Sequence, residues 1–156
     1  MATHEAILLP TEVNPTNYRM SLAPDFDHFT FSCSEDIDLV ISKPVRQITL
    51  HGVDLTVFSS FLVYDDEDVR PVSIETNEQA ETATFVFDRE IPAGLAVLHI
   101  MFQGILSDNL AGFYRSRVDM SDGTTRWMAT TQFEATDARK AFFCIDEPAR
   151  KATFDV

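Results

Sequence analysis

Apolar and polar residues alternate along several stretches of the chain, with the period of two that is typical of strands with one buried face. The longest stretch runs from Phe29 to Ile41, and Glu35 is the one charged residue on its apolar side. Shorter alternations cover residues 82–87 and 98–103. Helical spacing of apolar residues is missing from windows of comparable length, so we expect little helix. The apolar positions of the three stretches are Phe29, Phe31, Cys33, Ile37, Leu39, Ile41, Ala83, Phe85, Phe87, Leu98, Ile100 and Phe102.

Turn-forming residues separate these stretches, as at Pro92-Ala93-Gly94 and Ser121-Asp122-Gly123,. The pattern therefore predicts an all-β fold of antiparallel strands in a saddle-like or sandwich-like arrangement. The acidic tract 65–68 falls between two predicted strands. Its carboxylates are ligands that hard cations prefer, but a run that is polar throughout fits the solvated tip of a hairpin better.

A further strand is expected over residues 127–133, which are rich in aromatic, β-branched and apolar side chains,. In an extended chain, residues two apart share a face, so Gln132 and Glu134 are expected to project together. Thr136 and Asp137 then offer a helix cap. This predicts one or two short helical turns within residues 136–143.

Size and charge limit the classes of function. The chain has 156 residues, enough for one domain, and a net charge of −13, which argues against nucleic acid or an anionic membrane as a partner,. No stretch approaches the roughly 20 consecutive apolar residues of a membrane span. The start lacks the positively charged region of a secretory signal, so we expect a cytoplasmic protein. Cys33 and Cys144 are expected to be reduced, with Cys33 at an inward strand position.

Three sequence motifs, taken together, resemble those of a known protein family. The first runs from Thr130, reads Thr-Thr-Gln-Phe-Glu-Ala-Thr-Asp-Ala-Arg, and is followed by Cys-Ile-Asp-Glu-Pro at 144–148. The second, Gly-Phe-Tyr-Arg-Ser at 112–116, precedes it by the length of a hairpin. The third lies near the start and comprises Leu9, Pro10, Val13, Pro15, Tyr18 and Arg19.

These motifs resemble the N-terminal domain of zinc aminopeptidases of the aminopeptidase N and puromycin-sensitive aminopeptidase family, which are gluzincin metallopeptidases. The resemblance implies a protein that removes residues one at a time from the amino termini of peptides. Two residues depart from the family pattern: Phe143 stands where most members have Pro, and Ile145 stands where an aromatic residue follows the Cys. We therefore expect the loop at 142–147 to follow a somewhat different path.

The resemblance also implies substrate-binding roles for two residues. Glu134 would lie against the α-ammonium group of the peptide substrate, and Gln132 would line the pocket for its first side chain. A charge-assisted hydrogen bond of this kind contributes roughly 1.5 to 3 kcal/mol. Taken without the resemblance, Glu134 would instead be a strand-end carboxylate that pairs with Arg139 or Lys140.

Catalytic and zinc-binding residues are not expected within residues 1–156. A gluzincin site needs His-Glu-x-x-His on a helix, and the one similar string, at residues 4–8, has Leu8 in place of the second ligand,. The family's Gly-x-Met-Glu-Asn motif is also missing. Zinc and the catalytic domain are therefore expected in a longer polypeptide. Residues 151–156 read as the start of another strand, so we expect residues 1–156 to be a truncated N-terminal domain.

If this interpretation is right, the 156-residue piece has no peptidase activity by itself, and its partner is the catalytic domain of the same longer polypeptide. Open sheet edges would then favour self-association. The alternative is a non-catalytic β-sandwich that binds protein partners, and a lipocalin-like carrier fits less well because the strands do not close a barrel easily. The remaining charged or aromatic motif residues are expected to be architectural: Tyr114, Arg115, Asp137, Arg139, Asp146 and Glu147.

Overall fold

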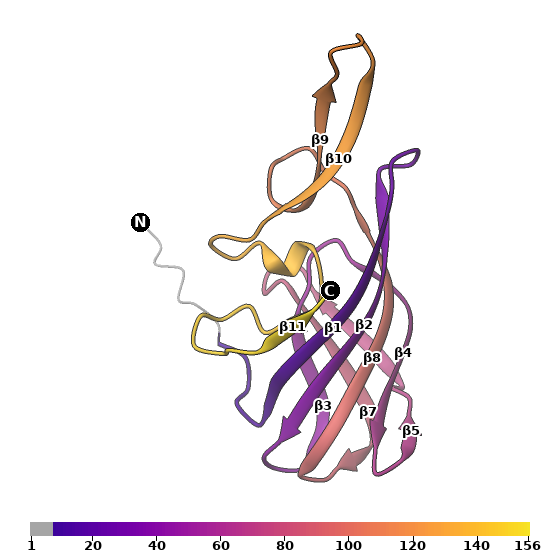
Figure 1. Ribbon diagram of the computed structural model, residues 1–156. Helices are drawn as coiled ribbons and strands as arrows, with labels where there is room; N and C mark the ends of the chain where they lie inside the picture. The colour runs from indigo at the N-terminus through magenta and orange to yellow at the C-terminus, as the bar shows by residue number, and fades with distance from the viewer. Residues whose placement is uncertain (1–7) are drawn as a thin grey trace.

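A six-stranded sheet forms one layer of the fold in the computed structural model, which describes residues 8–156 (Figure 1). Its strand order is β11-β1-β2-β8-β4-β5. Neighbouring strands are antiparallel, apart from the parallel pair of β1 and β11. The strands are β1 (Val13–Asp25), β2 (Thr30–Ile41), β4 (Thr56–Tyr64), β5 (Glu67–Val69), β8 (Gly94–Ile105) and β11 (Thr153–Asp155).

A three-stranded antiparallel sheet packs against this layer, and a two-stranded ribbon projects from the body (Figure 1). The small sheet has the order β3-β7-β6, with β3 (Val45–His51), β6 (Ser73–Asn77) and β7 (Thr82–Ile91). The ribbon pairs β9 (Gly112–Asp119) with β10 (Thr125–Gln132). Within residues 8–156, helix is limited to a 3-10 turn at Ala138–Lys140. The predicted all-β class and the short turn are both confirmed.

The core between the two sheets is built from the alternating positions. The apolar residues predicted to point inward are buried from Phe31 onward, whereas Phe29 lies just before β2 and is partly buried. Phe143 joins the layers, because its ring lies 5.9 Å from that of Phe85 on the small sheet and 5.1 Å from that of Phe102 on the large one. A Cβ at Gly52 would lie 2.5 Å from the Phe143 ring, so the glycine makes room for it.

Glu35 lies within this core, on the apolar face of β2 as its sequence position predicts. It is fully buried, and its Oε2 accepts a hydrogen bond from the Phe143 N–H at 3.2 Å. The other oxygen, Oε1, has no hydrogen-bond partner among residues 8–156. Burial raises the pKa of Glu35 well above its ordinary value, and the hydrogen bond from Phe143 opposes this only in part,. The carboxyl group is therefore protonated above the pH at which an exposed glutamate ionises.

Three smaller expectations concern the cysteines, the acidic tract and membrane spans. Cys33 and Cys144 are buried free thiols, as predicted. Asp65 and Asp66 form the turn between β4 and β5, both with positive φ, which confirms the hairpin tip for these two residues, whereas Glu67 and Asp68 belong to β5. In the part of the chain from residue 8 onward, no helix is long and apolar enough to cross a membrane.

Candidate functional site

The segment that follows the ribbon turns sharply back toward the body. After β10 ends at Gln132, the Asp137 N–H donates to the Phe133 carbonyl oxygen at 3.0 Å and closes a turn. The peptide bond between Glu134 and Ala135 within this turn is cis. Asp137 occupies the predicted cap position, but the predicted side-chain cap is wrong: its carboxylate pairs with Lys140 at 2.7 Å instead.

Gln132 and Glu134 are both exposed at this turn. The Glu134 N–H donates to the Gln132 Oε1 at 3.2 Å. Because the strand ends at Gln132, strand periodicity does not extend to Glu134, and this hydrogen bond, rather than a shared strand face, links the two residues. Their contacts with a substrate remain a prediction.

The alternative pairing of Glu134 with a neighbouring cation does not occur. Arg139 pairs with Glu81 at 2.8 Å and with Asp146 at 3.0 Å, and Lys140 is engaged within the turn. Among the ion pairs of residues 8–156, none includes Glu134. The Glu134 carboxylate is therefore open to a cation supplied from outside this domain.

Arg139 attaches the segment to the body through its side chain and its main chain. Its guanidinium group is buried, and its carbonyl oxygen accepts the Val53 N–H at 2.9 Å. The Asp146 N–H donates to the His51 Nδ1 at 3.0 Å, which leaves the ring proton on Nε2,. Burial, assisted by the charge of Arg139, lowers the pKa of His51 and keeps the ring neutral. These contacts confirm the architectural role predicted for Arg139 and Asp146.

Glu147 and Arg150 connect the segment to the start of the chain. The Glu147 Oε1 accepts the Leu9 N–H at 2.6 Å, and Glu147 also pairs with Arg150 at 3.4 Å. Arg150 donates to the carbonyl oxygens of Leu9 and Pro10 and to the Asn14 side chain. The Leu9-Pro10 motif is therefore held against the segment that contains the Asp-Glu-Pro motif.

The Gly-Phe-Tyr-Arg-Ser motif supports the turn from β9. Gly112 pairs with Gln132 at the base of the ribbon and has φ of +70°, and a Cβ there would lie 2.6 Å from the Lys140 Cβ. Glycine is the residue that this close approach allows. The Arg115 guanidinium lies 4.2 Å from the centre of the Phe29 ring and pairs with Asp108, which confirms the predicted packing and salt-bridge role of Arg115.

The loop at 142–147 turns its unusual residues inward. Phe143 and Ile145 are both buried, and the Ile145 N–H donates to the Tyr18 hydroxyl at 3.1 Å. The Phe143 N–H, which proline would lack, donates to Glu35,. Sequence reasoning missed this contact, and its one signal was a charged residue on the apolar side of a predicted strand.

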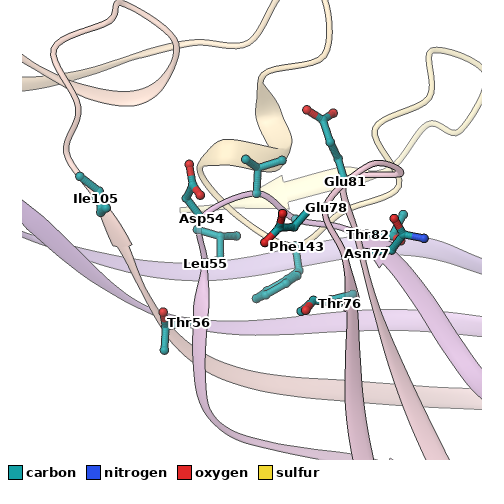
Figure 2. Close-up of a pocket in the computed structure, with 13 residues that line it drawn as sticks. Asp54, Leu55, Thr56, Thr76, Asn77, Glu78, Glu81, Thr82, Ile105 and Phe143 are labelled. Atoms are coloured by element: carbon teal, nitrogen blue, oxygen red, sulfur yellow. The ribbon is translucent and has the colours of Figure 1, made fainter. Parts of the chain in front are cut away.

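A cavity of about 530 Å³ lies beside this loop, with Phe143 in its lining and Asp54, Glu78 and Glu81 on its loops (Figure 2). Gln132 and Glu134 do not line it, so it is separate from the predicted substrate contact.

No group of three or more His, Cys, Asp or Glu residues that could hold a metal ion occurs within residues 8–156, and residues 4–7 of the His-Glu string lie outside the described residues.

The all-β fold and its anchored segment at 133–150 agree with a known protein family. Residues 14–156 match the Peptidase M1 N-terminal domain, and the chain belongs to that family. The predicted resemblance to the aminopeptidases is confirmed.

Three relatives illustrate the similarity. Aminopeptidase 2 of Candida albicans is 40% identical over 153 residues, which cover 97% of this chain and 16% of the relative. The alanine/arginine aminopeptidase of Saccharomyces cerevisiae is 42% identical over 154 residues, covering 96% of this chain and 18% of the relative. The puromycin-sensitive aminopeptidase of Caenorhabditis elegans is 36% identical over 150 residues, covering 95% and 16%. The chain thus spans less than a fifth of the length of these relatives.

Proposed function

We propose that this domain is part of a longer zinc aminopeptidase and contacts the amino terminus of its peptide substrate. Glu134 binds the α-ammonium group, and Gln132 lines the pocket for the first side chain. Zinc, the water that it activates and the catalytic residues come from a catalytic domain elsewhere in the polypeptide. The names of the relatives support an aminopeptidase activity.

The observation that carries this proposal is the exposed Glu134 carboxylate, which is free of ion pairs within the described chain and stands on a turn bonded to the body. An aminopeptidase must distinguish a free ammonium group from an internal amide. A carboxylate does so because it forms a charge-assisted hydrogen bond with the ammonium group but gains little from a neutral amide. A rigid support keeps the group where the substrate meets it.

The test is Glu134→Gln in the full-length protein, with an aminoacyl p-nitroanilide as substrate. Loss of a charge-assisted hydrogen bond of roughly 1.5 to 3 kcal/mol predicts that KM rises by about 10- to 150-fold. We expect kcat to change much less, because the contact holds substrate and transition state alike. Glu75→Gln removes an exposed carboxylate from β6 and serves as the charge control. Equal KM values for Glu134→Gln and the unmodified protein would contradict the proposed role.

Zinc and the cellular location are tested by extending the reading frame and by microscopy. We expect His-Glu-x-x-His within the following few hundred residues, and a cytoplasmic signal from a fluorescent fusion of the full-length protein. A continuation without that zinc motif would instead favour the non-catalytic β-sandwich that binds protein partners.

A further inference from the structure

Glu134 has very different neighbours on its two sides along the chain. On its upstream side is Gln132, the last residue of a ribbon that projects from the body (Figure 1). On its downstream side, the turn closed by the Asp137 N–H leads directly into the 3-10 turn at Ala138–Lys140. The Glu134 carboxylate is therefore held relative to the body from the downstream side, in addition to the packing of its upstream neighbour Phe133 on Phe142.

Arg139 stands at the centre of that 3-10 turn and bonds to three separate segments. Its NH1 donates to Glu81, just before β7, and its Nε donates to Asp146 in the following loop. Its carbonyl oxygen accepts the Val53 N–H from the connection between β3 and β4. Its side chain is 10% exposed and that of Asp146 is 14% exposed, so the bond between them is largely shielded from water, whereas Glu81 is 42% exposed. A rigid planar guanidinium group with several donors fixes geometry in a way that lysine does not.

We propose that Arg139 is a positioning residue for Glu134: its bonds to Glu81, Asp146 and Val53 hold the turn, and thereby hold the Glu134 carboxylate at the substrate's ammonium group. This inference rests on the proposed function and extends it to the residue that supports the contact. Phe133 also packs edge-on against Phe142 at 5.8 Å, a contact that Arg139 substitutions leave in place. The turn thus keeps an attachment that favours folding of the variants.

A double-mutant cycle in the full-length protein tests this coupling. We expect Arg139→Lys to raise KM for an aminoacyl p-nitroanilide by about tenfold, because a small misplacement of a contact group weakens binding strongly. In the Glu134→Gln background, the same substitution should change KM by less than about twofold, because the group that it positions is already lost. We expect kcat to stay within about twofold in both backgrounds.

Arg150→Lys is the matched control. Arg150 has a similarly shielded side chain, at 13% exposure, but it bonds to the start of the chain rather than to the turn. Its substitution should lower the melting temperature without raising KM. Should Arg139→Lys fail to fold, Glu81→Gln removes the charge of one partner of Arg139, at a side chain that is 42% exposed. We expect about a threefold increase in KM, which again vanishes in the Glu134→Gln background.

The outcomes separate the two proposals. An increase in KM with Glu134→Gln, together with an Arg139→Lys effect that disappears in that background, supports positioning. If Glu134→Gln raises KM but Arg139→Lys has no effect, or has the same effect in both backgrounds, the positioning role is overturned and the substrate contact stands. If Glu134→Gln leaves KM unchanged, the substrate contact fails, and the positioning role fails with it.

Discussion

Replacing the buried Glu35 by glutamine isolates one ionisable group in the core. The carboxyl group is enclosed on β2, accepts one hydrogen bond from the Phe143 N–H, and has a pKa raised well above its ordinary value by burial. A glutamine has nearly the same shape and can accept the same hydrogen bond, but it does not titrate. The unmodified protein and Glu35→Gln therefore differ in one titratable proton, which the folded unmodified protein binds.

The size and sign of the effect follow from linkage between protonation and folding. In the unfolded chain Glu35 loses its proton near pH 4.5, whereas the folded chain keeps it to a higher pH. Between those two pKa values the folded state binds one more proton than the unfolded state. The contribution of Glu35 to the free energy of unfolding is therefore fully present below about pH 4.5, and it falls as pH rises, by about 1.4 kcal/mol per pH unit. The fall ends once the pH exceeds the raised pKa of the folded state,.

The assay is urea denaturation of both proteins at a series of pH values from 4 to 8. The free energy of unfolding of the unmodified protein minus that of Glu35→Gln should fall above about pH 4.5 and level off above the raised pKa of the folded state, since the other carboxylates contribute equally to both proteins,. Glu75→Gln controls for loss of a surface carboxylate. A difference between the unmodified protein and Glu35→Gln that stays constant across the series would refute the reasoning, because the folded and unfolded states would then titrate Glu35 alike.

Two further predictions concern the core and the sheet edges. Phe143→Ala should reduce the free energy of unfolding by about 3 to 5 kcal/mol in urea denaturation, because it empties the space between Phe85 and Phe102,. Phe58 is 63% exposed and serves as the control. A loss for Phe143→Ala no larger than that for Phe58→Ala would contradict this prediction. Among residues 8–156, strands β5 and β11 are the unpaired edges of the large sheet, so the 156-residue chain should self-associate in light scattering as concentration rises,. A strictly monomeric profile at high concentration would show that these edges do not pair.

The sequence pattern predicted which side of each strand is buried, but not which strands are neighbours. Alternation along residues 29–41 and 98–103 reports that one face meets the core, and the buried side chains agree. It contains no information about the partner strand. The pairing of β2 with β8 places Asp36 opposite His99, 63 residues away, and depends on how the whole core closes.

For the predicted substrate contact, too, the sequence identified the residues but not their local structure. The resemblance identified Gln132 and Glu134, but local rules placed both on one strand face, whereas the strand ends at Gln132 and a turn carries Glu134. Arg139 gave no local sign of burial. One of its partners, Glu81, lies 58 residues away in the sequence, so its enclosure follows from tertiary packing rather than from its neighbours along the chain.

A tilt of the ribbon of β9 and β10 would displace its tip much more than its base. Gln132 pairs with Gly112 at its base, and Thr125 pairs with Asp119 toward its tip. Each strand has eight residues, and at about 3.3 Å per residue a tilt of about 5° about the base would move the far end by about 2 Å,. The same tilt barely displaces a residue at the pivot. A rocking ribbon would thus sweep its tip through the solvent while Gln132 stays nearly still.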